Sequence, residues 1–154
     1  MQVLPRRIPP EGAMETGEDP ADVLELEHEH GIRAAGPVRY ALRLQLVSHE
    51  LVARGKVEAK VEAQCARCVR WFAQDVVEPD FCEAVAVPDL DASVDLTPLL
   101  REAILLALSA HPVCRPECKG LCPRCGADLN EGPCRCPPVA DVHGWSALDD
   151  IELK

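Results

Sequence analysis

Two segments of the chain alternate between apolar and polar residues in the way that half-buried strands do. In residues 38–46 every even-numbered position is apolar, and in residues 57–64 valine and alanine alternate with charged or amide side chains. Successive side chains of a strand point to opposite faces, so both segments are predicted to be strands with one face in water, as in an antiparallel sheet. Gly55, just ahead of the second segment, is predicted to form a bulge or bend.

Weaker patterns predict the other strands. Residues 72–77 resume a strand soon after the second alternating segment, and residues 23–28 predict a short half-buried strand. Residues 3–8 fit a short edge strand within a turn-rich lead that proline and glycine interrupt. Residues 78–94 are predicted to be loop-rich, with Phe81 and residues 85–87 as a candidate for one further strand.

One helix is predicted, from Pro98 to about Ser109. Thr97 is a suitable N-cap, and Pro98 fits the first helical position. Leucine, isoleucine and alanine cover a broad face of this segment and extend almost all round it. A helix that is apolar on nearly every side is predicted to be buried, lying across the sheet.

These elements predict an α+β protein in three parts. An antiparallel sheet, open or barrel-like, and one buried helix occupy residues 1–112. A cysteine-rich zinc module follows over residues 113–138, and a tail over residues 139–154. Apolar residues at three-residue spacing in the tail either pack back on the domain or anchor a partner. They are Trp145, Leu148 and Ile151.

Charge and the lack of an export signal narrow the function. The chain has 154 residues, of which 26 are acidic and 16 basic, for a net charge of −10. Proteins that coat nucleic acid through bulk charge are usually basic, so any RNA contact is expected to use a local patch or a partner. No signal peptide or membrane-length apolar run is found, so we expect a cytoplasmic protein that does not associate with a membrane. We also expect no small-molecule substrate.

Cysteine is the most informative residue type. Six of the nine cysteines fall in residues 114–136. Thiols stay reduced in the cytosol, so this density predicts metal ligands and not disulfides. Eight cysteines form four close pairs, which suit two tetrahedral four-sulfur zinc sites. The pairs are Cys65/Cys68, Cys114/Cys118, Cys122/Cys125 and Cys134/Cys136.

One pairing of these cysteines is favoured. Cys122-Pro-Arg-Cys125-Gly126 is a zinc-knuckle sequence, and with the last pair it would hold one zinc as a compact ribbon. The first two pairs would share a second zinc that joins the tip of the sheet to the exit of the helix. A closed four-sulfur shell leaves no position for water or substrate, so both ions would be structural. The alternative is one zinc among the six C-terminal cysteines, with Cys65 and Cys68 unused.

Other cysteine chemistries fit less well. Cys65-Ala-Arg-Cys68 lies between strands, whereas a thioredoxin-like redox motif belongs to a βαβ pattern. An iron–sulfur cluster suits the knuckle sequence less well than zinc does. Cys82 has no neighbouring cysteine and is predicted to be a small buried apolar residue.

Six basic residues lie in or beside the cysteine pairs. Zinc with four thiolates carries a net charge of about −2, so these residues could compensate that charge or form a small basic surface for phosphates. No aromatic residue interleaves with them, so no platform for base stacking is predicted. They are Arg67, Arg70, Arg115, Lys119, Arg124 and Arg135.

Several motifs occur in a specific order. An alternating strand follows Gly55 and leads into Cys65-Ala-Arg-Cys68. Next comes the helix that begins with Asp95-Leu-Thr-Pro. The last motif is Cys118-Lys-Gly-Leu-Cys-Pro-Arg-Cys-Gly-Ala-Asp-Leu-Asn, followed by Cys-x-Cys. Over about residues 38–148 this order resembles the YceD family of large ribosomal RNA subunit accumulation proteins. The resemblance implies a bacterial cytosolic accessory protein that supports the synthesis, processing or stability of that RNA.

The predicted function is a non-enzymatic accessory factor for large-subunit (23S) ribosomal RNA accumulation or processing in ribosome biogenesis. It would bind that RNA or a ribosome-biogenesis protein. No catalytic constellation is found in the sequence, which has no Ser or Cys nucleophile beside a His and no phosphate-binding glycine loop. The alternatives are a zinc-stabilised protein-binding scaffold without direct RNA contact, and a thiol redox or metal sensor.

Overall fold

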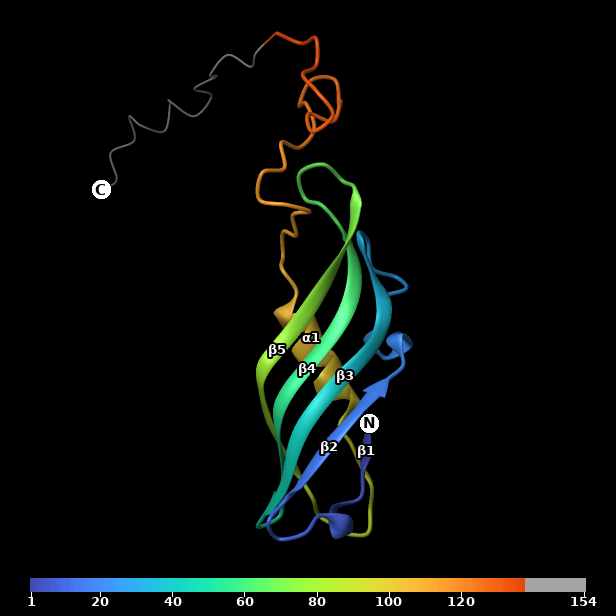
Figure 1. Ribbon diagram of the computed structural model, residues 1–154. Helices are drawn as coiled ribbons and strands as arrows, with labels where there is room; N and C mark the ends of the chain where they lie inside the picture. Colours follow the sequence, from blue (N-terminus) through green and yellow to red (C-terminus); the bar gives the residue numbers. More distant parts are fainter. Residues whose placement is uncertain (138–154) are drawn as a thin grey trace, which may run out of the picture.

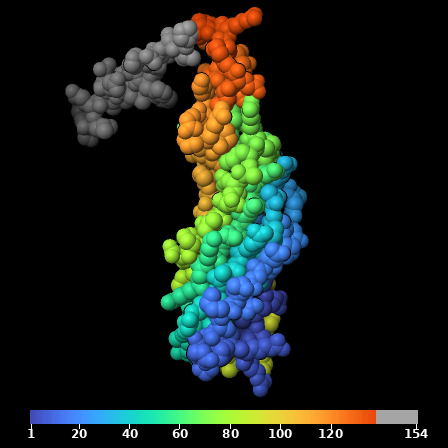
Figure 2. Space-filling view, in the orientation of Figure 1, coloured from blue at the N-terminus to red at the C-terminus, as the bar shows by residue number. Residues whose placement is uncertain are grey.

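A long antiparallel sheet forms the body of the molecule. The computed structural model describes residues 1–137. The sheet has the strand order β2-β3-β4-β5, with β2 at Ala13–Asp19, β3 at Ile32–Val47, β4 at Glu50–Gln64 and β5 at Trp71–Ala86. The last three strands are 15 or 16 residues long, and they make the molecule elongated (Figure 1, Figure 2).

Short elements and one helix complete the fold. β1 (Gln2–Val3) pairs with β6 (Val94–Asp95), and 3₁₀ turns cover Pro5–Arg7 and Ala21–Leu24. The helix α1 (Thr97–Ala107) lies across one face of the sheet, behind the strands in Figure 1. We call this covered face the inner face and the opposite one the outer face. No helix in the described part of the chain is long and apolar enough to cross a lipid bilayer.

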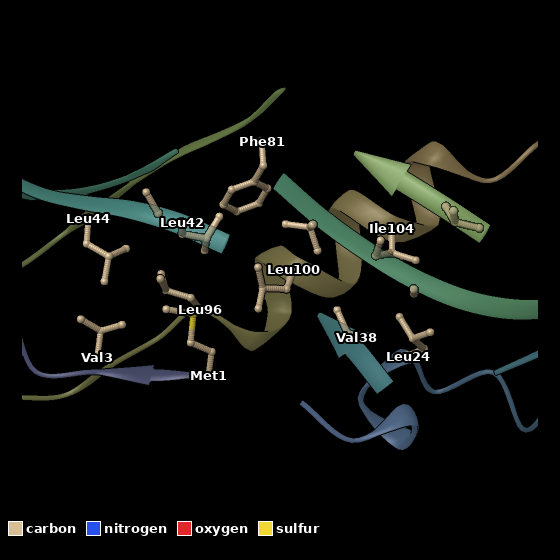
Figure 3. Close-up of a cluster of buried hydrophobic side chains, with 14 of the residues drawn as sticks. Met1, Val3, Leu24, Val38, Leu42, Leu44, Phe81, Leu96, Leu100 and Ile104 are labelled. Atoms are coloured by element: carbon tan, nitrogen blue, oxygen red, sulfur yellow. The ribbon is translucent and has the colours of Figure 1, made fainter. Parts of the chain in front are cut away.

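The core lies between α1 and the inner face of the sheet. Val38 and Leu42 of β3 and Phe81 of β5 are buried in one cluster with Leu100 and Ile104 of the helix (Figure 3). Burying one such side chain contributes about 1.5–3 kcal/mol, so this cluster accounts for the attachment of the helix to the sheet. The largest side chains without exposed surface include Leu24, Leu42, Leu51, Leu96, Leu100 and Ile104.

Both alternating segments form strands with one buried face, as predicted. Antiparallel pairing of β3 with β4 places Val38 opposite Ala59 and Leu42 opposite Gly55. Gly55 also forms the predicted bulge, because the register of β4 against β5 shifts between Gly55 and Val57. Its φ is +152°, and a Cβ atom there would lie 2.1 Å from the carbonyl oxygen of Ala41, so glycine is required.

The sheet stays open, with β2 and β5 as its edges, so a barrel is not formed. The strand β2 falls in a segment for which only turns were predicted. Its sequence, Ala-Met-Glu-Thr-Gly-Glu-Asp, has no alternation, and five of its seven residues are exposed. The strand forms because it pairs with β3, from Ala13↔Leu44 to Asp19↔Val38, and not because of its own sequence pattern.

Two further segments differ from the predictions. Residues 23–28 do not form a strand, since Ala21–Leu24 is a 3₁₀ turn and Glu25 has a positive φ of 51°. Leu24 is nevertheless fully buried, so its apolar character reports burial and not strand geometry. Within residues 78–94, β5 continues to Ala86, so the loop prediction is wrong in the first half, while the candidate strand at Phe81 and residues 85–87 falls largely within β5.

Helix α1 is buried on one side only. Leu100 and Ile104 have no exposed surface, whereas Leu106 is 78% exposed. The prediction of burial on nearly every side is therefore wrong for the face that points away from the sheet. The predicted N-cap is also wrong, because Thr97 is already helical and its backbone N–H donates to Asp95 Oδ1 at 2.9 Å.

Cys82 is exposed, contrary to the prediction that it is buried. Its neighbour Phe81 is 4% exposed and packs in the core, so the strand turns Cys82 to the outer face, opposite Arg54. Three steps of β5, from Glu78 to Phe81, face two steps of β4, so an extra residue interrupts the alternation just ahead of Cys82 and the sequence pattern does not reveal the face.

Candidate metal centres

Four cysteines from two distant segments meet at one end of the sheet. Cys65 and Cys68 lie in the turn between β4 and β5, while Cys114 and Cys118 follow the end of α1. Their sulfur atoms all lie within 4.8 Å of one another. The Sγ–Sγ distances are 3.8 Å for Cys65–Cys118 and 3.8 Å for Cys68–Cys114. We call these four residues the clasp quartet.

These distances fit a metal tetrahedron. With Zn–S bonds of about 2.3 Å, the sulfur atoms of a tetrahedral site are about 3.8 Å apart. Three of the four residues of the clasp quartet are at most 5% exposed: Cys65, Cys68 and Cys118. The group can therefore hold a tetrahedral ion in a shell closed to solvent.

The turn between β4 and β5 aims its backbone at the first sulfur. The N–H of Val69 donates to the carbonyl of Cys65 at 2.8 Å, and the N–H of Cys65 donates to the carbonyl of Arg70 at 2.9 Å. The N–H of Arg67 points to Cys65 Sγ at 3.4 Å. Val69 closes the turn with a positive φ of 60°, which is unusual for a β-branched residue.

Arg67 holds the two segments of the clasp quartet together. Its Nη1 donates to the carbonyl oxygens of Pro116 and Cys118, each at 3.0 Å. Its own carbonyl accepts the N–H of Leu121 at 3.1 Å. Gly120 is needed beside it, because its φ is +73° and a Cβ atom would lie 3.0 Å from the Arg67 carbonyl oxygen.

A second group of four cysteines lies beyond the first. Cys122, Cys125, Cys134 and Cys136 also have all their sulfur atoms within 4.8 Å of one another, and we call them the knuckle quartet. The N–H of Gly126, whose φ is 72°, donates to the carbonyl of Cys122 at 2.9 Å. This group is more open than the clasp quartet, because Cys122 is buried but Cys125 is exposed.

The thiols of each quartet differ in acidity. Burial raises the pKa of Cys65, but the N–H groups and thiols around it outweigh burial and lower the value to about 6. The N–H groups of Cys125 and Arg124 similarly lower the pKa of Cys122 to about 6.

Each quartet also contains a thiol that resists ionisation. Burial and the neighbouring sulfurs raise the pKa of Cys114 to about 12. The Cys125 thiol and burial raise that of Cys136 to about 12. In the clasp quartet, burial also acts to raise the pKa of Cys118, but the N–H of Gly120 and the Asn130 amide outweigh burial and lower the value. A soft divalent ion would stabilise the remaining thiolates of each quartet.

Asn130 connects the two quartets. It lies in the loop of the knuckle quartet, yet its Nδ2 donates to Cys118 Sγ of the clasp quartet at 3.5 Å. Its Oδ1 accepts the backbone N–H of Lys119 at 2.9 Å and the guanidinium of Arg115 at 3.0 Å. Asn130 was not among the predicted site residues, because its place two residues after the short Leu121–Asp128 bridge becomes meaningful only when the quartets are assembled.

Half of the six predicted RNA-binding residues make contacts within the protein. Arg67 holds the clasp, Arg115 bonds Asn130, and Arg70 pairs with Asp128 at 2.8 Å and also with Glu131. The side chains of the other three make no hydrogen bond or ion pair within residues 1–137, and all three are exposed. They are Lys119, Arg124 and Arg135.

The structure assembles the same two groups of four as the favoured pairing. The alternative, with Cys65 and Cys68 unused, does not match this geometry. Zinc ligation and the RNA-binding role of the basic residues stay predictions. Trp145, Leu148 and Ile151 of the tail lie outside the described residues.

The fold and the site together define a class of α+β protein in which a long antiparallel sheet ends in a module of two four-cysteine groups. The family described as "Large ribosomal RNA subunit accumulation protein YceD" matches residues 74–152, and the chain belongs to this family. The resemblance found in the sequence is therefore confirmed. The match includes α1 and the C-terminal cysteines, whereas Cys65 and Cys68 precede it.

The chain is also similar to proteins of bacteria and plants. An uncharacterised protein of Mycobacterium tuberculosis is 34% identical over 107 residues, which cover 60% of this chain and 51% of the relative. A Zea mays protein named large ribosomal RNA subunit accumulation protein YCED homolog 1, chloroplastic, is 37% identical over 73 residues, covering 47% of this chain and 25% of that protein. The chain thus spans about half the length of the mycobacterial relative. No solved structure matches it.

Proposed function

We propose that the protein is a non-enzymatic accessory factor for the accumulation of large-subunit ribosomal RNA, acting in ribosome biogenesis by binding that RNA. Membership of the YceD family carries this proposal, because the family's description names large-subunit RNA accumulation. The name of the maize relative agrees. The chain spans about half of the mycobacterial relative, so the role is taken from the family and not from a whole relative.

Zinc is the ion proposed for both quartets. Four thiolates at tetrahedral spacing suit zinc, and a shell of four sulfurs leaves no position for substrate. The zinc of the clasp quartet would attach the segment after α1 to the turn between β4 and β5. The zinc of the knuckle quartet would fold the last loop, so both ions support a surface and neither performs chemistry.

The RNA contact is proposed to include the three basic residues of the module whose side chains have no partner within residues 1–137, namely Lys119, Arg124 and Arg135. Exposed cations without acidic partners are available to phosphate oxygens, whereas Arg67, Arg70 and Arg115 are engaged within the protein. This division gives the zinc module two kinds of exposed basic residue, one bonded to other groups of the protein and one without a side-chain partner in residues 1–137.

Metal analysis tests the sites. Natively purified protein is expected to contain two zinc ions per chain and one thiol, Cys82, that reacts at once with a maleimide. One zinc per chain, or three or more fast-reacting thiols, would contradict the assignment of eight cysteines to two sites.

RNA binding is tested by crosslinking in cells and by titrating transcribed 23S RNA fragments with purified protein. Replacing Lys119, Arg124 and Arg135 by glutamine should weaken binding, and each lost phosphate contact should reduce the slope of log affinity against log salt by about 1. If wild-type protein binds no RNA and instead co-purifies with one biogenesis protein, the scaffold alternative replaces this proposal.

Exposure of Cys125 favours a second candidate function, a thiol sensor. Hydrogen peroxide would oxidise two thiolates of the knuckle quartet to a disulfide, with two protons taken up and two waters formed, and zinc would leave. If zinc stays bound in dilute peroxide until the protein unfolds, this function is excluded.

A further inference from the structure

The outer face of the sheet is a broad surface that no element of residues 1–137 covers. Helix α1 lies behind the strands in Figure 1, and Figure 2 shows the outer face in the same orientation. Residues directly opposite each other on paired strands share a face, so the strand register shows which side chains are neighbours on the outer face.

Three cross-strand pairs on this face join opposite charges. Arg33 lies opposite Glu62 and pairs with it at 2.5 Å, and Lys60 lies opposite Asp75 at 4.0 Å. Arg39 lies opposite Glu58 and also pairs with Glu18 of β2 at 3.6 Å. These complementary pairs are the usual arrangement on a solvated sheet.

Arg43 and Arg54 break this rule, because they are directly opposite each other and carry the same charge. Arg54 makes no ion pair or hydrogen bond with the described residues, although Asp80 lines the same hollow. Arg43 donates to the carbonyl oxygen of Glu11 at 2.8 Å and has no acidic partner in residues 1–137. Like charges directly opposite each other destabilise a sheet, and a bound anion would offset this cost.

On the hairpin side of the Arg39/Glu58 pair, the outer-facing positions of β3 and β4 hold one carboxylate, Glu50, which lies opposite Val47 at the hairpin, two residue pairs beyond Arg43/Arg54. Between the Arg39/Glu58 pair and the hairpin, these positions hold one further cation, Lys56, which pairs with Glu58 at 2.5 Å. Apolar Met14 of β2 is 64% exposed beside Arg43. We call this surface the arginine face. Its members on β3 and β4 are Ala41, Arg43, Gln45, Val52, Arg54 and Lys56.

The net charge of −10 makes this surface unusual, because the protein as a whole repels polyanions. Guanidinium groups bind phosphate oxygens through two parallel hydrogen bonds, so two opposed arginines suit a phosphodiester chain. The arginine face has no aromatic residue, which argues for contact with the RNA backbone and not for base stacking.

We propose that the arginine face binds the phosphate backbone of large-subunit RNA, as a second contact beyond the zinc module. This inference rests on the proposed RNA-binding function, which it extends to a surface of the sheet.

Charge removal on the face is the first test. R43Q/R54Q should bind transcribed 23S RNA fragments at least ~10-fold more weakly than wild type, with the salt slope lowered by about 2. R6Q/R7Q is the matched control, since it removes two exposed arginines from the 3₁₀ turn near β1 and should change binding less than ~2-fold. Thermal unfolding of both variants checks that the fold is kept.

The outcomes separate the two proposals. If wild type binds RNA and R43Q/R54Q binds equally well, the arginine face is wrong while the proposed function stands. If wild type binds no RNA, both fail, and retention of an acidic protein by wild type but not by R43Q/R54Q would then mark the face as a protein-docking surface.

Cys82 provides a second readout, because it lies opposite Arg54 on this face. In zinc-loaded protein, bound RNA should slow alkylation of Cys82 by N-ethylmaleimide about 5-fold or more, because RNA on this face would reduce the access of the reagent to the thiol. The R43Q/R54Q variant should lose this protection. A control thiol from Ser93→Cys, at the β1–β6 end, should react at the same rate with and without RNA, and unprotected Cys82 in RNA-bound wild type would overturn the inference.

Discussion

The clasp quartet and the knuckle quartet use the same local chemistry. Each begins with a Cys-x-x-Cys turn whose next residue has a positive φ, 60° at Val69 and 72° at Gly126. Each has one first cysteine with a pKa of about 6 and one distant cysteine with a pKa of about 12. The turn geometry therefore determines which sulfur ionises first.

The two quartets differ in how far the chain must travel to build them. Sulfurs of the clasp quartet come from residues 53 and 46 positions apart and are mostly buried. The knuckle quartet is contained in residues 122–136 and is partly open. The first quartet is therefore a tertiary cross-link and the second a local fold, although their ligands are identical.

Removing one ligand from each quartet should show this difference most strongly. Cys118→Ser is expected to lower the free energy of unfolding by roughly 3 kcal/mol or more, because it frees the segment after α1 from the sheet. Cys134→Ser should lower the free energy of unfolding of the sheet by about 1 kcal/mol, because the loop that it frees is held only by neighbouring residues of the knuckle quartet. Urea unfolding followed by circular dichroism measures both, with zinc content falling by one ion in each variant.

An equal loss of stability in the two serine variants would contradict the distinction. Ser93→Ala, an exposed site far from both quartets, serves as the control and should leave unfolding unchanged within about 0.5 kcal/mol.

Chelation should release the two ions at different rates. The exposed Cys125 admits a chelator to the knuckle quartet, so its zinc should leave about tenfold faster than that of the clasp quartet, whose ligands are mostly buried. A zinc-sensitive dye follows the release. The fast phase should be missing in Cys134→Ser, and a single phase in wild-type protein would show that the quartets are equally open.

Asn130→Ala should weaken the clasp quartet, to which its side chain donates, and not the knuckle quartet, in whose loop it lies. Loss of its hydrogen bond to Cys118 Sγ is expected to lower the zinc affinity of the clasp quartet by about 10-fold, the usual scale for groups that support a ligand. Competition with a chelator measures the affinity. A loss confined to the fast-releasing ion would show that Asn130 serves the knuckle quartet alone.

Exchanging the residues that follow each Cys-x-x-Cys tests the two turns themselves. Gly126→Val is expected to destabilise the knuckle quartet by about 1–2 kcal/mol, because a β-branched residue is strained at positive φ. Val69→Gly should stabilise the clasp by up to about 1 kcal/mol, since relief of strain is partly offset by glycine's greater freedom when unfolded. Thermal unfolding measures both, and destabilisation by Val69→Gly would show that packing of Val69 outweighs its strain.

Local features of this protein could be read from its sequence because they depend on neighbouring residues. The alternation in residues 38–46 and 57–64 marks a strand face, and the apolar run after Pro98 marks α1. The spacing of cysteine pairs marks metal ligands. The strand β2 has no such pattern, because its stability comes from the ladder with β3.

Tertiary pairing decided the features that join distant residues. Only the register brings Arg43 opposite Arg54, and only the clasp geometry brings Asn130 to Cys118. The predicted burial of Cys82 rested on its distance from other cysteines, and it failed because an extra residue in β5 between Glu78 and Phe81 changes which face the later residues occupy. A one-residue shift reverses the face of every later side chain, and a sequence pattern does not report that shift.

The cysteine pairs and their order were thus determined by the sequence alone, through the short turns that hold two sulfurs together. The grouping of those pairs depends on the hairpin that carries Cys65 and Cys68 to the end of α1. Two tetrahedra form because the length of β4 and β5 brings that turn to the segment after the helix. Spacing along the chain specifies the ligands, and the sheet specifies which of them meet.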